Sequence, residues 1–473
     1  MTNSFTHYLK KNVCAIVWVQ RRLVMKIAGR INEFLIVSSI RCRVGAFGFR
    51  YLFPGALRQS IARIMGDFGN LIGDLSRKSV WRTTGSGLNI VFVGSHKSAV
   101  DVVSPLIEGQ QALEHVGEVW VLKLPWAARQ WYRQGADLVI FEHSRIYPFR
   151  PRGGLLSFCV PHWVNQTIPY TASMDDLLAG NRYNSLRRNI NKSRKAGCEW
   201  RFSRSREDFD FFYQRLYVPF TSSRHGDQAH IAPYPLQWDL WIQKAGGGLV
   251  LVTQDGQTVA GAVCLVCNDI CYNIEVGVRD ADESLLQQGI NTYLFWAVAE
   301  WGKQQGAKFY NMGGSFGWRS NGTFRWKAKW GSCVTRKDNP YRVLSMTADR
   351  VAPLLMEKLN AIGYVCETRG SMYGLVFHEV GSQPSESELS EMILRAQKEG
   401  LRGLCLLAPG RAPQFYAEES ILAQDLSKTA KMRPRCPLKK IPQERGKSAD
   451  VAAHDNDAPE PSAHPESRYE TTT

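Results

Sequence analysis

A lysine between two tryptophans is the residue in this sequence whose chemistry is easiest to interpret. Residues 322–331 contain Trp326, Lys327 and Trp330. An ammonium group held between two indole rings is partly shielded from water, so its charge acts strongly on a nearby oxyanion. Lys327 is therefore the first candidate catalytic residue. The alternative is a surface lysine whose aliphatic stem packs on tryptophan while its charge stays in water.

A carboxylate inside an apolar segment is the second candidate. Glu275 lies in residues 273–277, which have the pattern of a strand. A carboxylate at such a position can accept the proton of an attacking amine, directly or through a water molecule. Because side chains alternate between the two faces of a strand, the alternative is a residue that only faces solvent.

The beginning of a long helix, predicted over 285–305 and ended by Gly306, could bind phosphate. Gln287, Gln288 and Gly289 would place free backbone N–H groups and the positive end of the helix dipole there. This suits the phosphates of an activated donor such as coenzyme A. An ordinary helix cap explains the same residues without a ligand.

A basic helix, predicted over 181–195 with Gly197 as its cap, could bind a second anion. Arg187, Arg188 and Lys192 lie in it, and Arg188 and Lys192, four residues apart, share one face. They could hold a phosphorylated acceptor, a donor tRNA or a nucleotide-linked sugar. The alternative is a solvated basic face.

The elements that must position these residues are three strands, a helix and a fourth strand. Residues 248–253 and 259–267 predict a hairpin, because Asp255-Gly256 suits its tight turn. A third strand is predicted over 270–277, and a fourth over 308–312 after the long helix. The order β-β-β-α-β predicts a mixed α/β (α+β) core.

These motifs together resemble the acyl-transfer core of the GNAT superfamily, and more narrowly its FemAB-like and BioF2-like acetyltransferase group. They lie within residues 175–335: the basic helix 183–192, residues 285–289, and Asn311-Met312-Gly313-Gly314 followed by 322–331. The last segment fits the group's pattern of glycine, three residues, an aromatic residue, lysine, two residues, an aromatic residue and glycine.

The resemblance implies a GNAT-like acyl-CoA N-acyltransferase fold and an enzyme that moves an acyl or aminoacyl group to an amine acceptor. Its donor would be acyl-CoA or, alternatively, aminoacyl-tRNA, and no metal is implied. The acceptor would belong to cell-envelope or exopolysaccharide synthesis. Lys327 would assist the transfer, and the donor would be contacted by Gln287, Gln288, Gly289, Asn291, Trp326 and Trp330.

Two positions depart from the family's pattern. Asn291 stands where the superfamily has a second small residue in its phosphate-binding loop, which leaves room for a donor other than coenzyme A. Asn311 stands where the family often has aspartate, and an amide cannot act as a base. A non-catalytic protein that binds nucleic acid or a membrane surface through a GNAT-like scaffold is therefore the alternative function.

The rest of the chain divides by composition. We expect a basic amphipathic segment at 1–85, a first α/β unit at 86–174, the GNAT-like core at 175–340, a small α/β extension at 341–420 and a disordered tail at 421–473. Because FemAB-like proteins carry two such domains, the first unit would be a degenerate GNAT-like half in tandem with the core.

Charge and cysteine content place the protein among basic, cytosolic ones. Lys and Arg outnumber Asp and Glu by 59 to 43, and residues 1–82 hold 14 basic residues against three acidic ones. This excess predicts an anionic partner: a nucleic acid such as tRNA, a phosphorylated small molecule, or an anionic membrane contacted by residues 1–82 from the cytoplasmic side. An odd number of cysteines, 11, without a paired framework indicates reduced thiols. The oligomeric state is left open.

Two rival motifs are weaker. Cys264, Cys267 and Cys271 have a spacing that could suggest a metal site, but they fall on two predicted strands joined by Asn268-Asp269. Residues 313–317 match the G-x-S-x-G pattern of a serine hydrolase. That pattern needs a helix directly after the serine, whereas residues 318–322 predict a turn.

Overall fold

The structure is a computed structural model, and it describes residues 73–85, 87–107, 112–144, 154–170, 174–226, 229, 231–337 and 342–417. The expectations for most of the basic segment, residues 1–72, and for the tail after residue 417 lie outside the described residues. No helix in the described ranges is both long and apolar enough to cross a membrane.

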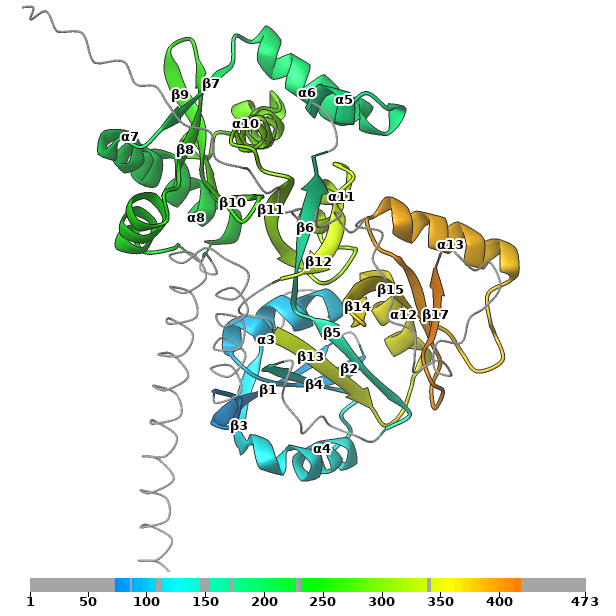
Figure 1. Ribbon diagram of the computed structural model, residues 1–473. Helices are drawn as coiled ribbons and strands as arrows, with labels where there is room; N and C mark the ends of the chain where they lie inside the picture. The colour runs from blue at the N-terminus through cyan, green and yellow to red at the C-terminus, as the bar shows by residue number, and fades with distance from the viewer. Residues whose placement is uncertain are drawn as a thin grey trace, which may run out of the picture. The chain divides into compact units, whose positions relative to one another are not determined.

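The first sheet has six strands in the order β3-β1-β2-β4-β13-β5. Its strand β13 comes from far along the chain and lies between β4 and β5, as its yellow-green colour among blue and cyan strands shows in Figure 1. The strands and the helices between them are β1 Arg77–Gly85, β2 Leu88–Val93, α3 His96–Val103, η1 Ser104–Leu106, β3 Glu114–Trp120, η2 Val121–Lys123, α4 Leu124–Arg133, β4 Leu138–Ser144, β5 Leu156–Pro161 and β13 Arg342–Ala348.

The second sheet has seven strands in the order β12-β6-β11-β10-β9-β8-β7. Its strands are β6 Trp163–Pro169, β7 Glu199–Ser203, β8 Gly248–Gln254, β9 Gln257–Cys267, β10 Ile270–Val278, β11 Phe309–Phe316 and β12 Cys333–Arg336. Its helices are α5 Met174–Leu177, η3 Asn181–Tyr183, α6 Asn184–Lys195, α7 Arg206–Phe211, η4 Phe212–Tyr217, α8 Val218–His225, η6 Leu236–Lys244, η7 Arg279–Ala281, α9 Glu283–Gln287, α10 Ile290–Gln304 and α11 Gly322–Ala328.

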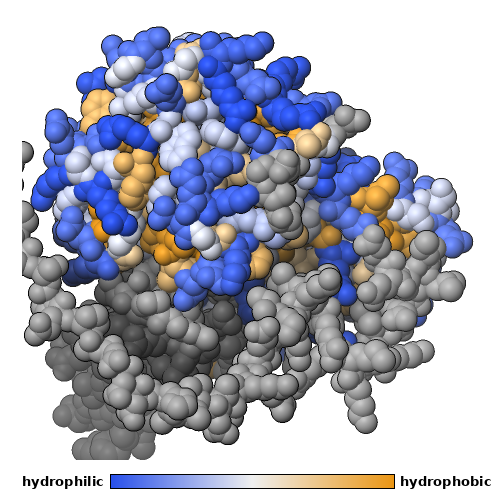
Figure 2. Space-filling model, turned by 45° about the horizontal axis from the view of Figure 1, so that its top comes forward, coloured by the Kyte–Doolittle hydropathy of each residue, from blue (hydrophilic) through white to orange (hydrophobic). Residues whose placement is uncertain are grey.

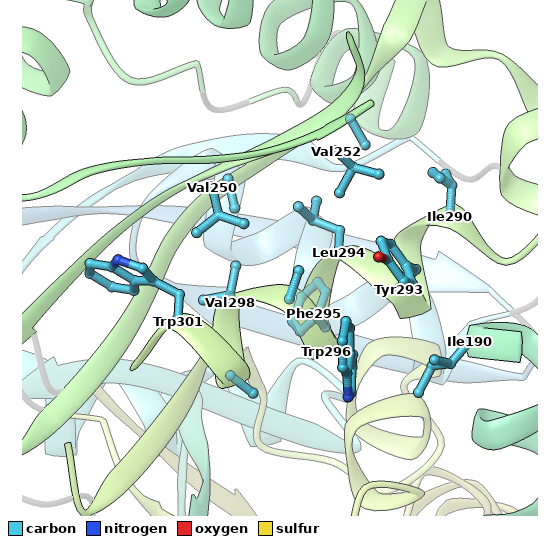
Figure 3. Close-up of a cluster of buried hydrophobic side chains, with 14 of the residues drawn as sticks. Ile190, Val250, Val252, Ile290, Tyr293, Leu294, Phe295, Trp296, Val298 and Trp301 are labelled. Atoms are coloured by element: carbon cyan, nitrogen blue, oxygen red, sulfur yellow. The ribbon is translucent and has the colours of Figure 1, made fainter. Parts of the chain in front are cut away.

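The strand β8 shows how the second sheet is covered on both faces. Val250 and Val252 pack with α10, whereas Leu249 and Leu251 pack with η4 and η6. This alternation follows from the two-residue period of a strand. Figure 3 shows the first of these clusters, in which Leu294 and Val298 of α10 lie beside the two valines.

The predicted hairpin and third strand are confirmed. The turn residues Asp255, Gly256, Asn268 and Asp269 all have positive φ, the conformation that a two-residue hairpin turn requires. The segments around them form the antiparallel ladder β8-β9-β10. The β-β-β-α-β order thus follows from local turn chemistry and from apolar segments of strand length.

One predicted element was wrong in part. The long helix expected over 285–305 is two helices, α9 and α10, separated at Gly289, whose φ of +89° interrupts the helical backbone.

The third sheet has four strands in the order β14-β15-β16-β17, with helices α12 and α13 beside them. In this sheet β15, α13 and β16 follow one another as a β-α-β unit. Ser385 and Glu388 form a capping box that fixes the beginning of α13. The elements are α12 Pro353–Ile362, β14 Val365–Thr368, β15 Ser371–Phe377, α13 Glu386–Lys398, β16 Gly403–Leu407 and β17 Gln414–Ala417.

A buried polar cluster lies where the first sheet passes into the second. His162 stands between β5 and β6, and its Nδ1 lies 3.3 Å from Oε1 of Glu142. Arg342 contacts the same carboxylate and also Asp74, at 2.9 Å. Burial alone would raise the pKa of Glu142, but the hydrogen bond with His162 and the charge of Arg342 hold it well below its ordinary range.

Candidate functional site

The strands β10 and β11 separate halfway along their length. Their parallel ladder runs only from Ile270 paired with Phe309 to Tyr272 paired with Asn311. Beyond it, β10 continues along β9 to Val278 and β11 continues along β6 to Phe316, each after a register shift. The backbone edges that face each other past this point are no longer joined by a ladder, as a binding wedge requires.

Lys327 lies beside this separation. It belongs to α11, whose first turn is capped by the Asn321 side chain accepting from the N–H of Phe324. The lysine is only 4% exposed, and its Nζ donates to the carbonyl oxygen of Gly314 on β11 at 2.8 Å. Burial, and then the charge of Lys337, lower the pKa of Lys327 to about 7. Near neutral pH its side chain is therefore divided between ammonium and amine.

The expectation that Trp326 and Trp330 hold the Lys327 ammonium between them was wrong. Trp326 packs edge-on against Phe295 of α10, and Trp330 is completely buried in the core of the seven-stranded sheet. The two indoles therefore pack in the cluster that contains α10, whereas the lysine side chain extends to Gly314.

Glu275 lies on β10 just after the register shift between Asn273 and Glu275. It is partly buried, and burial raises its pKa to about 7, although the hydroxyl of Tyr217 and the charge of Lys337 act in the opposite direction. Glu275 does more than face solvent, because its carboxylate accepts a hydrogen bond from the hydroxyl of Tyr217 in η4.

A glycine allows η4 to come this close to β10. A Cβ on Gly277 would lie 2.4 Å from the carbonyl carbon of Leu216 and 2.5 Å from the nitrogen of Tyr217. Real Cβ atoms do not make such contacts with backbone, so only glycine permits the approach. The Tyr217 hydroxyl also accepts from the N–H of Ala232, which fixes its orientation toward Glu275.

Lys337 is the third charged residue at this place, and the sequence motifs did not predict it. It follows β12 directly, and its Nζ lies 4.8 Å from the ring centre of Trp163 on β6. Burial lowers its pKa and the Glu275 carboxylate raises it. The strand pairing, which no local pattern reveals, brings Lys337 to the residues that the motifs had identified.

The residues expected to bind the donor phosphates are covered by the basic helix α6. Lys192 donates to the carbonyl oxygen of Gln287 at 2.9 Å, and Ser193 donates to that of Gln288 at 3.2 Å. A Cβ on Gly289 would lie 2.9 Å from Cβ and from the carbonyl oxygen of Asn189. The candidate donor and acceptor residues are thus in contact, but α6 occupies the place where a phosphate would meet Gly289.

Asn291 and Asn311, the two positions that depart from the family's pattern, have different surroundings. The side-chain oxygen of Asn291 is buried without a hydrogen-bond partner at the beginning of α10. Asn311 has a structural role, because its side-chain oxygen accepts from the N–H of Gly313 at 2.9 Å. This contact stabilises the positive φ of Gly313, at the register shift beside Lys327.

The basic patch on α6 is only partly available to a ligand. The Arg187 guanidinium donates to the carbonyl oxygen of Ala179 and to the side chain of Asn184. Arg188 and Lys195 are exposed on the outer face of the helix. In Figure 2 the end of the molecule that carries α6 in Figure 1 is turned toward the viewer. The coloured surface seen there is largely hydrophilic.

The two rival motifs belong to the fold of the sheet. Ser315 lies inside β11, and its hydroxyl donates to Oε1 of Gln166 at 2.9 Å. The strand continues to Phe316 and α11 begins only at Gly322, so no helix follows the serine directly. Cys264 and Cys271 are buried on β9 and β10. Within the described ranges, no group of three or more histidine, cysteine, aspartate or glutamate residues could hold a metal ion.

The seven-stranded sheet has diverging central strands, β10 and β11, which are connected through α9 and α10. Residues 180–328 match the family model described as an acetyltransferase (GNAT) domain. The match concerns this segment, which is less than half of the chain. No protein with a curated description matches the chain in sequence.

Several solved structures are similar over much of their length at low identity. The C-terminal domain of an Agrobacterium fabrum protein assigned as a lysylphosphatidylglycerol synthetase is 15% identical, with 68% of this chain and 96% of that one covered and a TM-score of 0.32. L-PGS from Bacillus licheniformis is 16% identical, covering 65% and 93%, with a TM-score of 0.30. FemX is 12% identical, covering 56% and 83%, with a TM-score of 0.31. At these scores, none defines the fold of the whole chain or its substrates.

Proposed function

We propose that this protein is an N-acyltransferase whose reaction takes place where β10 and β11 separate. The observation that carries the proposal is the position of Lys327, which is buried with its Nζ on Gly314 at the edge of the diverging strands. Glu275 lies on the opposite strand after the same point of separation. A carbonyl between the strands would have an acid on one side and a base on the other.

The reaction joins the acceptor nitrogen to the donor carbonyl carbon and breaks the C–S bond of a thioester or the C–O bond of an ester. Glu275 takes the proton that the amine loses, because a carboxyl with a pKa of about 7 accepts protons efficiently at neutral pH. The Lys327 ammonium stabilises the oxyanion and then gives a proton to the leaving group. Solvent returns the proton from Glu275 to Lys327, so the enzyme ends unchanged.

The donor that we favour is an aminoacyl ester of tRNA, with acyl-CoA as the alternative. In the GNAT-like arrangement, coenzyme A needs the backbone N–H groups at the beginning of the helix that follows the third strand. Here Lys192, Ser193 and Asn189 of α6 already pack against that place. The exposed Arg188 and Lys195 on the same helix suit the phosphates of an RNA.

The amine acceptor that we infer belongs to cell-envelope or exopolysaccharide synthesis, as in the FemAB-like group that the sequence resembles. An envelope acceptor and a tRNA donor would both be reached from the cytoplasm. The donor determines which acyl group is transferred, and the proposal specifies the class of donor only.

Binding and turnover together test the proposal. Melting temperatures are compared with acetyl-CoA, with a long-chain acyl-CoA and with total aminoacyl-tRNA, since a ligand that binds only the native protein raises the melting temperature. We expect the shift with aminoacyl-tRNA. Replacement of Arg188 and Lys195 by Gln should weaken filter binding of that RNA, whereas replacement of Arg395 and Lys398 on α13, also exposed, should not.

Deacylation of the bound aminoacyl-tRNA in the presence of lysine amide as a probe amine then measures catalysis. Lys327→Met should lower this rate by about 10²- to 10³-fold, as the loss of one oxyanion-stabilising group does. A rise in melting temperature with acyl-CoA alone would show that acyl-CoA, and not aminoacyl-tRNA, is the donor. Equal deacylation by wild type and Lys327→Met would leave a binding protein without catalysis, and no shift with any donor would overturn the proposal.

A further inference from the structure

The most exposed large hydrophobic side chain in the described ranges is on α4. Trp126 is 67% exposed, and Leu122, four residues earlier in η2, is 53% exposed. An exposed tryptophan costs hydrophobic free energy that burial in a partner would recover. Two such residues one turn apart indicate a surface that is used for contact.

The inner face of the same segment is firmly packed. Val121, Leu124 and Ala128 are buried against the six-stranded sheet, in a cluster with Val139 and Phe141 of β4. The helix is therefore held in a fixed orientation, with the opposite face outward. Trp126, Arg129 and Arg133 are spaced by three and four residues, so they form one stripe along that outward face.

The charged side chains of the η2–α4 segment are all basic. Residues 121–136 contain Lys123, Arg129 and Arg133 and no acidic residue. Arg129 and Arg133, together with Arg350, also line a cavity of about 380 Å³ beside the helix. The cavity is lined by Asp137 and Asp349 as well, but Asp137 is engaged in accepting from the backbone N–H of Asn89 at 2.8 Å.

We propose that the outward face of η2 and α4 is a docking surface for an anionic lipid bilayer. Tryptophan and leucine beside lysine and arginine are the combination by which an amphipathic helix lies in a membrane interface. Trp126 and Leu122 enter the headgroup region, and Lys123, Arg129 and Arg133 contact lipid phosphates.

An acidic protein would meet the same charges, but it would not require two large apolar side chains to project so far into solvent. On the edge strand β3, Glu118 is paired with Arg77 at 3.7 Å. This inference is independent of the acyl-transfer proposal, since none of its residues lies on the strands around Lys327.

Flotation of the full chain with vesicles tests the surface. Vesicles of phosphatidylcholine with 30% phosphatidylglycerol should bind the protein, and pure phosphatidylcholine vesicles should bind it much less. Replacing Arg129 and Arg133 by Gln should weaken binding about fivefold for each residue removed, from about 1 kcal/mol per basic residue at such a surface. Trp126→Ala should weaken it about tenfold.

The matched control uses another helix with the same side-chain types. On α13, Leu394 is 51% exposed and is followed by the exposed Arg395 and Lys398. Leu394→Ala, and the double replacement of Arg395 and Lys398 by Gln, should leave vesicle binding unchanged. Far-UV circular dichroism and melting temperature check that every variant is folded.

The basic residues 1–82 could also bring the chain to anionic vesicles, so a local measurement is needed. Brominated lipids quench tryptophans that reach the bilayer. Trp126→Phe keeps an apolar side chain, so it should still float with vesicles while losing part of the quenching seen in wild type. Unchanged quenching in Trp126→Phe, or unchanged flotation in Trp126→Ala, would show that this face does not touch the membrane and would overturn the inference. Absence of binding to any vesicle would do the same.

Discussion

Lys327 and Lys337 approach the same glycine from different elements. The Nζ of Lys327 donates to the carbonyl oxygen of Gly314 at 2.8 Å, and the Nζ of Lys337 lies 3.3 Å from the position that a Cβ on Gly314 would occupy. Burial, and then the charge of Lys337, lower the pKa of Lys327, and burial lowers the pKa of Lys337 although the Glu275 carboxylate raises it. Such an arrangement reduces stability and is typical of functional sites.

Replacing Lys327 by Met should stabilise the protein, most strongly at low pH. Its pKa falls from 10.5 to about 7 on folding, so the unfolded chain binds more protons between these values. The penalty for burying the charge is complete below pH 7 and fades as pH rises toward 10.5. After the lost hydrogen bond is subtracted, we expect a gain of about 3 kcal/mol in the free energy of unfolding at pH 6.5 and little at pH 10, measured by urea unfolding.

The control for this substitution is Lys244→Met, which removes an exposed ammonium at the end of η6. It should change the free energy of unfolding by less than about 0.5 kcal/mol at both pH values. A loss of stability in Lys327→Met at pH 6.5 would show that the lysine supports the fold.

Replacing Glu275 by Gln should stabilise the protein with the opposite dependence on pH. Burial raises the pKa of this carboxyl from 4.5 to about 7, so the folded state binds more protons than the unfolded chain between these values. The cost of the charge is therefore absent below pH 4.5 and complete above pH 7. We expect a larger gain in melting temperature at pH 8 than at pH 5, because Gln can still accept from Tyr217.

The exposed Glu357 on α12 offers a matched substitution, Glu357→Gln. It should shift the melting temperature little and equally at pH 5 and pH 8. If Glu275→Gln were more stabilising at pH 5, Glu275 would be held as a carboxylate by its neighbours, and it would not be the base.

The parts of this molecule that the sequence predicted are those set by neighbouring residues. Asp255-Gly256 requires a hairpin turn, and the apolar segments around it can only be strands. The motifs also selected Lys327 and Glu275, which lie beside the diverging strands, and their catalytic roles stay a prediction. These residues lie on elements that follow one another closely along the chain.

Contacts between distant elements were not predictable in the same way. Lys337 reaches Gly314 only because β12 pairs with β6 and β6 with β11, and Tyr217 reaches Glu275 only because Gly277 lets η4 approach. The covering of Gly289 by Asn189 likewise depends on how α6 packs on α10. None of these arrangements has a periodic pattern or a turn signal in the sequence.

Replacing Gly314 by Ala should reduce turnover with little effect on stability. The backbone of Gly314 does not have a positive φ, so alanine is permitted there. Its Cβ would lie 3.3 Å from Nζ of Lys337 and 3.4 Å from the Trp163 ring, so the flexible end of Lys337 must move. We expect kcat to fall about tenfold, because small displacements of catalytic groups are costly.

Gly322→Ala is the control for this prediction, because a Cβ on Gly322 meets nothing within 4 Å and the residue begins the helix that carries Lys327. It should keep full activity and gain up to about 1 kcal/mol of stability from the reduced freedom of the unfolded chain. Full activity in Gly314→Ala would mean that Lys337 has no part in the reaction.

The rate of acyl transfer should have a narrow pH optimum near 7. Glu275 must be ionised to act as a base, so the rate rises with pH through a pKa of about 7, and Lys327 must be protonated, so the rate falls again through a pKa of about 7. Because Lys337 interacts with both groups, the two limbs report the pair as a whole. The profile is measured as kcat with the donor that the binding experiments identify.

Two substitutions separate the limbs of this profile. Glu275→Gln should lower kcat and flatten the rise below pH 7, because no base remains to be deprotonated. Lys327→Arg keeps a positive charge at every accessible pH, so the fall above pH 7 should disappear even though the larger side chain lowers kcat. An acidic limb that survives in Glu275→Gln would assign the proton transfer to another group, and Glu275 would then be a partner of Tyr217 alone.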